Sequence, residues 1–337
     1  MTRTRAKWRV LLAGLAIALA AAPAQAADAE LLNASYDVAR DVYRDLNPAF
    51  AAQYRGQTGK AVTIHQSHGG SSKQARAVID GLEADVLTMN NPLDIDQVAK
   101  AGLLQANWAG RLPNASAPSW SPILFLVRKG NPKKIRDWGD LVRPGVAVVL
   151  PNPKTSGNGR YSYLAGWEWA RRAGGGSDAA GEAYVRKLFA NVPVLDTGGR
   201  GASTTFTQRG IGDVLLTFEN EIALLRAELG ASDYEVVVPS LTVRADNPVA
   251  VVDKVAGKHG TAALAAAYLK YHYSPAAQEI FAKNYLRPVD DAVLQRHAAA
   301  FPKLDTFRVE AAFGSWPEAQ KKHFADGGVF DRIYTQR

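Results

Sequence analysis

Three segments rich in glycine and hydroxyl residues, 66–74, 151–160 and 196–203, have the composition of anion-binding loops. Each follows a short β-branched run and precedes an amphipathic stretch, so each is expected to connect a strand to a helix. The first turn of a helix presents N–H groups without intrahelical acceptors, at the positive end of the helix dipole. Glycine lets a ligand approach that backbone closely. One such junction is ordinary capping, but three that converge would surround a small oxyanion with donors.

Two serines are expected to begin the helices after the first two junctions. Ser71 with Gln74 fits a capping box, which predicts a helix from Ser71 through Ile79. Ser156 is the expected cap of the helix after the second junction. A serine in either place adds a hydroxyl donor to the backbone amides.

Two arginines, Arg160 and Arg200, lie beside the second and third junctions. Either guanidinium could bind an anion directly, or could pair with carboxylates and brace the loop. Burying an uncompensated dianion would cost on the order of tens of kcal/mol. Neutral donors can offset this cost if each oxygen of the anion is hydrogen-bonded. The residue types alone leave both roles open.

The elements that position these loops come from alternating short β-branched runs and amphipathic stretches. Helices are expected over 38–54, with a kink or break at Pro48, and over 261–273 and 276–284. The alternation predicts an α/β fold with parallel sheets covered on both faces. Strands are expected at 31–35, 62–66, 84–89, 123–128, 146–150, 192–196, 214–217, 234–238 and 249–252.

The composition is that of a globular protein of about two domains. The chain has 337 residues, of which 47% are hydrophobic and 21% charged. Cysteine is absent, which excludes a disulfide framework, a thiolate nucleophile, an iron–sulfur cluster and a sulfur-ligated zinc site.

The formal net charge of +8 comes partly from the N-terminus. Four cations within residues 1–9 precede an apolar run over 10–22 and a small-x-small site at 24–26, the pattern of a cleavable signal peptide covering 1–26. Removing it leaves a net charge of +4 on 311 residues. We therefore expect no nucleic-acid partner.

These loops, together with the rest of the mature chain, resemble the periplasmic sulfate-binding proteins of ABC importers. The resemblance is carried by runs at 31–37, 66–71, 73–75, 78–85, 125–132, 152–157, 191–196, 209–214, 267–270, 301–304 and 323–328. It implies a type II periplasmic binding-protein fold, in which two doubly wound α/β lobes are joined by a hinge.

The resemblance also implies how the chain is divided and what it does. Lobe 1 would contain residues 27–115 and 241–337, with C-terminal helices able to contact both lobes, and lobe 2 would contain 116–240. Segments 113–122 and 238–243 look like the crossings between the lobes. Sulfate would stabilise the closed form and pass to a membrane permease with a cytoplasmic ATPase. The protein would be a periplasmic monomer without cofactor, metal or catalytic residues.

The family's sulfate donors fall on five residues of this sequence: Ser71 in one lobe, and Ser156, Gly157, Asn158 and Gly199 in the other. Asp37 and Arg160 match family residues that brace the loops.

The sequence departs from the family at two places. Phe218 occupies the position where the family usually supplies an indole N–H donor. Unless Thr217, another side chain or water substitutes, this loss would cost about 1–3 kcal/mol of binding free energy. Residues 89–93 are Met-Asn-Asn-Pro-Leu, whereas the family commonly has a short apolar run that contains a tyrosine at this place. Thiosulfate, phosphate or molybdate are therefore alternative ligands.

Asp37 bears on the choice between sulfate and phosphate. Phosphate keeps a proton near neutral pH and needs a buried acceptor, whereas sulfate has no proton to donate. Asp37 ends the first expected strand, and phosphate becomes plausible if its carboxylate faces the ligand.

Enzymatic and metal-binding alternatives have little sequence support. His68-Gly69-Gly70 is similar to an oxyanion-hole motif, but the chain has no Gly-x-Ser-x-Gly nucleophile elbow. Ser162 occupies the third glycine position of a dinucleotide fingerprint beginning at Gly157, and no Gly-x-x-x-x-Gly-Lys loop occurs. The six histidines are scattered, without a carboxylate cluster beside them.

Overall fold

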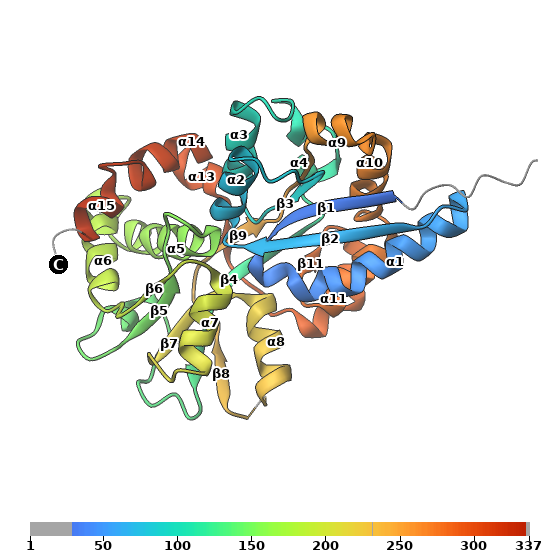
Figure 1. The fold of residues 1–337 in the computed structure, drawn as a ribbon. Helices are drawn as coiled ribbons and strands as arrows, with labels where there is room; N and C mark the ends of the chain where they lie inside the picture. Colours follow the sequence, from blue (N-terminus) through green and yellow to red (C-terminus); the bar gives the residue numbers. More distant parts are fainter. Residues whose placement is uncertain (1–28, 231, 335–337) are drawn as a thin grey trace, which may run out of the picture.

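The structure is a computed structural model that describes residues 29–230 and 232–334, so the expected signal peptide lies outside the described residues. Two β-sheets form the cores of two lobes (Figure 1). The first sheet contains, in spatial order, β10 (Val249–Val251), β3 (Val86–Thr88), β1 (Ala29–Tyr36) and β2 (Val62–Gly69). The second contains β12 (Thr306–Phe307), β9 (Thr242–Asp246), β4 (Ser119–Arg128), β7 (Val214–Phe218), β5 (Val148–Pro151) and β6 (Leu195–Asp196), while β8 (Tyr234–Val237) and β11 (Arg287–Pro288) also pair with β4.

Each sheet has a parallel core bordered by antiparallel strands. β1 runs parallel to β2 and β3, and β5 runs parallel to β6 and β7. β10 is antiparallel to β3, and β4 is antiparallel to β7, β8 and β9. The carboxyl ends of β1, β2 and β3 therefore lie at one edge of the first sheet, and those of β5, β6 and β7 at one edge of the second.

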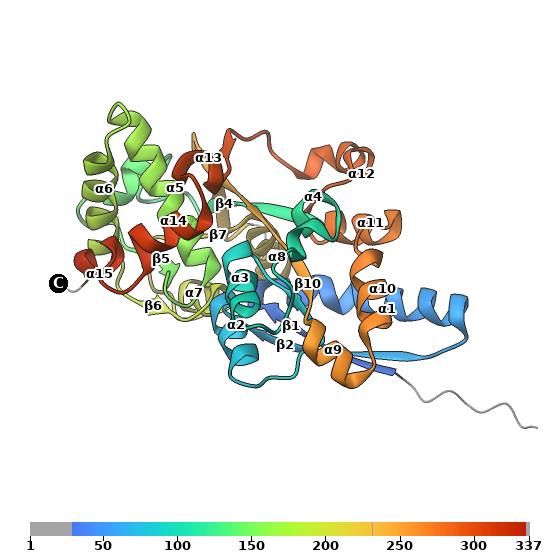
Figure 2. The same cartoon turned by 90° about the horizontal axis from the view of Figure 1, so that it is seen from above.

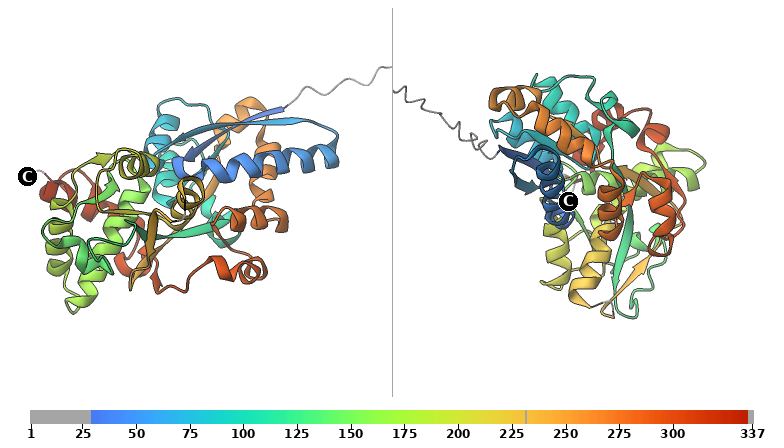
Figure 3. Two further views of the ribbon diagram at one scale, coloured as in Figure 1. Left: turned by 90° about the horizontal axis from the view of Figure 1, so that it is seen from below. Right: turned by 90° about the vertical axis from the view of Figure 1, so that its right-hand side faces the viewer.

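Helices cover both lobes. The first sheet is accompanied by α1 (Arg40–Thr58), α2 (Ser71–Ile79), α3 (Pro92–Lys100), α4 (Pro113–Ser116), α9 (Asp253–His259), α10 (Ala262–Tyr271), α11 (Pro275–Lys283) and α12 (Asp291–Arg296). The second is accompanied by α5 (Gly157–Ala173), α6 (Asp178–Ala190), α7 (Gly199–Thr207) and α8 (Glu219–Leu229). α1 runs alongside β2, as Figure 3 also shows.

The C-terminal segment lies along the second lobe. It contains α13 (Val309–Phe313), α14 (Trp316–Ala319) and α15 (Val329–Tyr334), of which α15 packs against α6 (Figure 2). β12 extends the second sheet beyond β9. The sequence led us to expect lobe 1 to resume at residue 241, but the strand that follows, β9, belongs to the second sheet. The chain returns to the first sheet only at 247–248, just before β10.

Apolar side chains alternate between the two faces of the second sheet. Along β4, Ile123, Phe125 and Val127 belong to one buried cluster, whereas Leu124 and Leu126 belong to another on the opposite face. A strand covered on both faces must be apolar at successive positions, as the run 123–127 is. The expected covering of the sheets by helices on both faces is confirmed.

Local predictions agree with the structure except at a few positions. Each expected strand overlaps an observed one, although only Leu195–Asp196 forms from the expected strand 192–196. Of the two alternatives expected at Pro48, two shorter helices are ruled out, because α1 continues through it with Leu46 and Phe50 buried on either side. β9 was not expected, because Pro239 and Ser240 beside it look like part of a crossing.

The pH dependence of stability can be tested at His259, which ends α9 near the first sheet. Its ring nitrogens lie 3.0 Å from Asp85 Oδ1 and 3.2 Å from Glu83 Oε2, and these hydrogen bonds raise the pKa of His259. A raised histidine pKa stabilises the fold below its ordinary value of about 6.5, and this effect is lost as pH rises through the folded pKa. His259→Gln should therefore lower the melting temperature most near about pH 6 and less near about pH 9. Thermal unfolding of both proteins across this range checks it; an equal loss at every pH would contradict it.

Candidate functional site

The carboxyl ends of six strands meet at the boundary between the lobes. The loops after β1, β2 and β3 come from the first lobe, and those after β5, β6 and β7 come from the second. All eight residues singled out from the sequence lie at the ends of these strands, on the loops or on the first turns of the helices that follow: Asp37, Ser71, Ser156, Gly157, Asn158, Arg160, Gly199 and Phe218. The topology therefore brings together residues that are far apart in the sequence.

Two buried serine hydroxyls are not used to cap their helices. Ser71 is the first residue of α2 rather than its cap, and Gln74 accepts a hydrogen bond from Ser67 Oγ at 3.1 Å. The expected capping box is therefore wrong. Ser156 is the N-cap residue of α5, as expected, but its side chain makes no capping hydrogen bond. Both residues are at most 2% exposed, so each adds a hydroxyl to a buried helix start.

Gly157, Asn158 and Gly199 contribute backbone amides. They occupy the first positions of α5 and α7, where N–H groups have no intrahelical acceptor. The Asn158 side chain is already engaged, since Nδ2 donates to Thr217 Oγ1 at 2.9 Å and Oδ1 accepts from Ser162 Oγ at 3.2 Å. These two bonds orient the side chain of Asn158, and its backbone N–H is available to a ligand.

The two lobes are in direct contact around these donors. A Cβ atom added to Gly70 would lie 2.6 Å from both the Thr155 and Thr197 carbonyl oxygens, which belong to the other lobe. A Cβ added to Gly157 would lie 1.9 Å from Asn90 Oδ1. At Gly70 the opposing atoms are backbone, so glycine is required for the lobes to approach this closely; at Gly157 a Cβ could be accepted only if the Asn90 side chain moved.

Asp37 lies between the lobes, with both carboxylate oxygens facing backbone amides. Oδ1 accepts from the N–H of Val38 at 3.0 Å, and Oδ2 accepts from the N–H of Arg200 at 3.1 Å. Burial raises the pKa of Asp37, while the hydrogen bond from Arg200 lowers it. The carboxylate thus ties the end of β1 to the first turn of α7, beside Gly199.

Arg160 forms a buried ion pair across the boundary between the lobes. Its NH1 lies 2.8 Å from Asp94 Oδ1 on α3, and its Nε donates to the Pro153 carbonyl at 3.1 Å. The two side chains are 3% and 0% exposed. Removing either partner would leave a buried unpaired charge.

Arg200 joins carboxylates from both lobes. It lies 2.8 Å from Asp41 Oδ2 on α1 and 3.3 Å from Glu221 Oε1 on α8. Burial raises the pKa of Glu221 to about 7, although the nearby Arg200 charge lowers it. These partners occupy the guanidinium, which supports a role in bracing the third junction.

Phe218 ends β7 and is 1% exposed. Its ring makes edge-to-face contacts with Tyr36 from the first lobe and Tyr161 from the second, at centroid distances of 6.4 and 6.2 Å. Phenylalanine has no N–H or O–H group. Phe218 itself therefore offers no side-chain donor, in contrast to the indole that the family resemblance leads one to expect there.

Two residues at the site were not assigned to it from the sequence, Asn90 and Asn91. They follow β3 and are 3% and 0% exposed. Asn91 caps α3 by accepting from the N–H of Asp94 at 3.2 Å. Their place after an expected strand, at the same sheet edge as the first junction, is the signal that could have found them.

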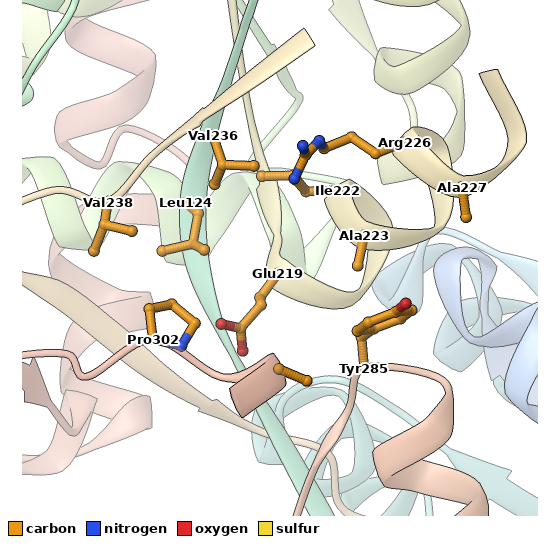
Figure 4. A pocket seen from close by; sticks show the side chains of 11 residues that line it. Leu124, Glu219, Ile222, Ala223, Arg226, Ala227, Val236, Val238, Tyr285 and Pro302 are labelled. Carbon is orange, nitrogen blue, oxygen red and sulfur yellow. The ribbon is translucent and has the colours of Figure 1, made fainter. Parts of the chain in front are cut away.

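A separate cavity of about 460 Å³ lies between α8 and the segment near residue 300 (Figure 4). Its lining is mostly apolar, and Glu219 reaches into it from the start of α8. The Glu219 carboxylate is held by Arg287 through contacts of 2.6 and 2.9 Å. This cavity includes none of the predicted anion-binding residues.

The described residues provide no group of three histidine or carboxylate side chains placed to hold a metal ion. His65, for example, lies 3.3 Å from Glu30 as an isolated pair. Within the same described ranges, no helix is long and apolar enough to cross a membrane.

Two α/β lobes that enclose a small site at their strand ends define a class of ligand-binding proteins that close around their ligands. A family model described as bacterial extracellular solute-binding protein matches residues 31–287. The chain belongs to this family.

Relatives along the full chain refine the comparison. The chain is 56% identical over 327 residues to the thiosulfate-binding protein of Pseudomonas aeruginosa, covering 97% of each protein. It is 52% identical to the sulfate-binding protein of Escherichia coli strain K12, covering 97% of this chain and 98% of that protein. The solved sulfate-binding protein SubI of Mycobacterium tuberculosis superposes with a TM-score of 0.78 at 32% identity, covering 88% of this chain and 99% of that one. The expected resemblance and the type II binding-protein fold are confirmed.

The enclosure of the site can be tested with Gly157→Ala. The added Cβ would overlap Asn90 Oδ1, so either the Asn90 side chain must move or the lobes must stay apart. We expect oxyanion affinity to fall about tenfold or more. Gly56→Ala is the matched control, because nothing lies within 4 Å of its added Cβ on α1. Unchanged affinity in Gly157→Ala, measured by calorimetry, would show that the cleft closes differently.

Proposed function

We propose that this protein binds sulfate or thiosulfate between its lobes and delivers it to an ABC permease. The observation that carries the proposal is the convergence of helix starts and uncommitted serine hydroxyls from both lobes on one enclosed site. Backbone amides can only donate hydrogen bonds, and these serine hydroxyls are free to donate. Such groups suit an anion that carries no proton. The names of the relatives from Pseudomonas aeruginosa and Escherichia coli support the same ligand class.

The proposed donors are the hydroxyls of Ser71 and Ser156 and the backbone amides of Gly157, Asn158 and Gly199. Fixed amides and helix dipoles would pair the anion oxygens without a neutralising cation. Asp37 and Arg160 would act indirectly, by holding the loops that carry these donors. Because the donors come from both lobes, only the closed form would make every contact.

Phosphate is a weaker candidate because of how Asp37 is placed. Its two oxygens accept hydrogen bonds from the Val38 and Arg200 amides. A receptor for protonated phosphate would need an acceptor free to face the ligand. The geometry therefore favours an anion without a proton.

The wider role follows from the family and its relatives. We propose export by the 1–26 signal peptide, a periplasmic location, a monomer, and transfer of the anion to permease subunits driven by a cytoplasmic ATPase. We propose a first lobe built on the β10-β3-β1-β2 sheet and a second built on the other sheet, with 306–334 packed on the latter. No chemical turnover is expected, in keeping with relatives named as binding proteins.

Calorimetry on the mature protein tests the ligand class. We expect one site for sulfate or thiosulfate, with weaker binding of phosphate and molybdate. Affinity should change little between about pH 6 and 8, because sulfate keeps its charge there and the donors are neutral. Binding of phosphate without sulfate or thiosulfate would overturn the donor-only interpretation, and hydrolysis of sulfate esters would revive an enzymatic role.

Thiosulfate is favoured as a second candidate by Phe218. The terminal sulfur of thiosulfate is a weaker hydrogen-bond acceptor than oxygen. Thiosulfate therefore loses less binding free energy than sulfate when this sulfur faces the Phe218 ring. Phe218→Trp would add an indole N–H and should tighten sulfate binding by about tenfold to a hundredfold, with a smaller gain for thiosulfate. Phe313→Trp, at a half-buried position on α13, is the control for adding an indole elsewhere. Equal or weaker sulfate binding in Phe218→Trp would show that the site already has another donor there.

A further inference from the structure

We propose that Asn90 is a further ligand-binding residue, whose side-chain amide donates a hydrogen bond to the oxyanion from the first lobe. This inference rests on the proposed function. It assigns a donor to a segment that departs from the family pattern, and three observations support it.

The first observation is position. Asn90 follows β3, and its backbone N–H lies 3.5 Å from Ser71 Oγ. Its side-chain oxygen lies against the α-carbon of Gly157, where a Cβ would approach to 1.9 Å. Asn90 therefore lies between the proposed donors of the two lobes.

The second observation is the orientation of the amide, which a chain of hydrogen bonds sets. Asn91 accepts from the N–H of Asp94 through Oδ1 and donates from Nδ2 to Asp94 Oδ2 at 2.8 Å, which fixes its two ends. The same Nδ2 lies 3.4 Å from Asn90 Oδ1. Because the NH₂ group of Asn91 faces the side-chain oxygen of Asn90, the Nδ2 group of Asn90 points away from Asn91.

The third observation is that this Nδ2 group is available. Asn90 is 97% buried, since 3% of its surface is exposed. Within 29–230 and 232–334, no acceptor is hydrogen-bonded to Asn90 Nδ2, whereas Asn90 Oδ1 accepts from Asn91 Nδ2 at 3.4 Å. A charge-assisted hydrogen bond to an anion would engage this donor.

Asn90 would supply a donor from the lobe opposite Phe218. The phenylalanine removes a side-chain donor from the second lobe, and Asn90 supplies one from the first. Asp94, which orients Asn91, is held by Arg160 at 2.8 Å, so the Arg160 ion pair would also support the orientation of Asn90.

The test compares sulfate and thiosulfate affinities of the mature wild-type protein with those of Asn90→Ala and Asn90→Asp. Asn90→Ala should bind both anions about ten- to a hundredfold more weakly. Asn90→Asp keeps the side-chain shape, replaces the donor by a carboxylate and should bind at least as weakly. Asn33→Ala is the matched control, because Asn33 is a fully buried asparagine of β1 that accepts from Thr88 Oγ1 at 3.0 Å.

The outcomes separate this inference from the proposed function. Weaker binding in both Asn90 variants, with the melting temperature of the unliganded protein unchanged and Asn33→Ala binding normally, is the expected result. Wild-type affinity in Asn90→Ala or Asn90→Asp would overturn the inference and leave the proposed function standing. A wild-type protein that binds neither anion would overturn the proposed function itself.

Discussion

The proposed binding of a doubly charged anion depends on offsetting the cost of removing that ion from water. Solvation of such an ion can be replaced only by many short hydrogen bonds fixed in advance. Parallel strands of two sheets deliver these donors, because their carboxyl ends and the helix starts that follow lie at the same edges. The amides of Gly157 and Gly199 and the serine hydroxyls would need little reorganisation to meet the proposed ligand.

Charged residues surround this neutral shell and hold it in place. Asp37 ties the first lobe to the amide next to Gly199, and Arg160 pairs with Asp94 across the boundary between the lobes. In both cases a charge is satisfied by protein groups rather than by the proposed ligand. Loop geometry is thereby coupled to lobe closure, since each of these bonds exists only when the lobes meet.

Sequence patterns predicted the strands and the three junctions, because β-branched runs and glycine-rich helix starts are local signals. The failures concern tertiary context. Neighbouring buried residues keep α1 continuous through Pro48, and β9 is a strand because it pairs with β4. The direction of the Asp37 carboxylate and the place of Asn90 against Gly157 depend on contacts with residues of the other lobe that are far away in the sequence, and no local pattern encodes such contacts.

Gly70 gives the closed cleft a steric limit. Its α-carbon faces two carbonyl oxygens of the opposite lobe, so backbone meets backbone with no flexible side chain between them. Such a contact cannot adapt by changing a rotamer. The width of the cleft is therefore set by the main chain, and an oversized anion would change the angle between the lobes instead of being accommodated locally. Ligand size would in this way become a difference in overall shape that a membrane partner could distinguish.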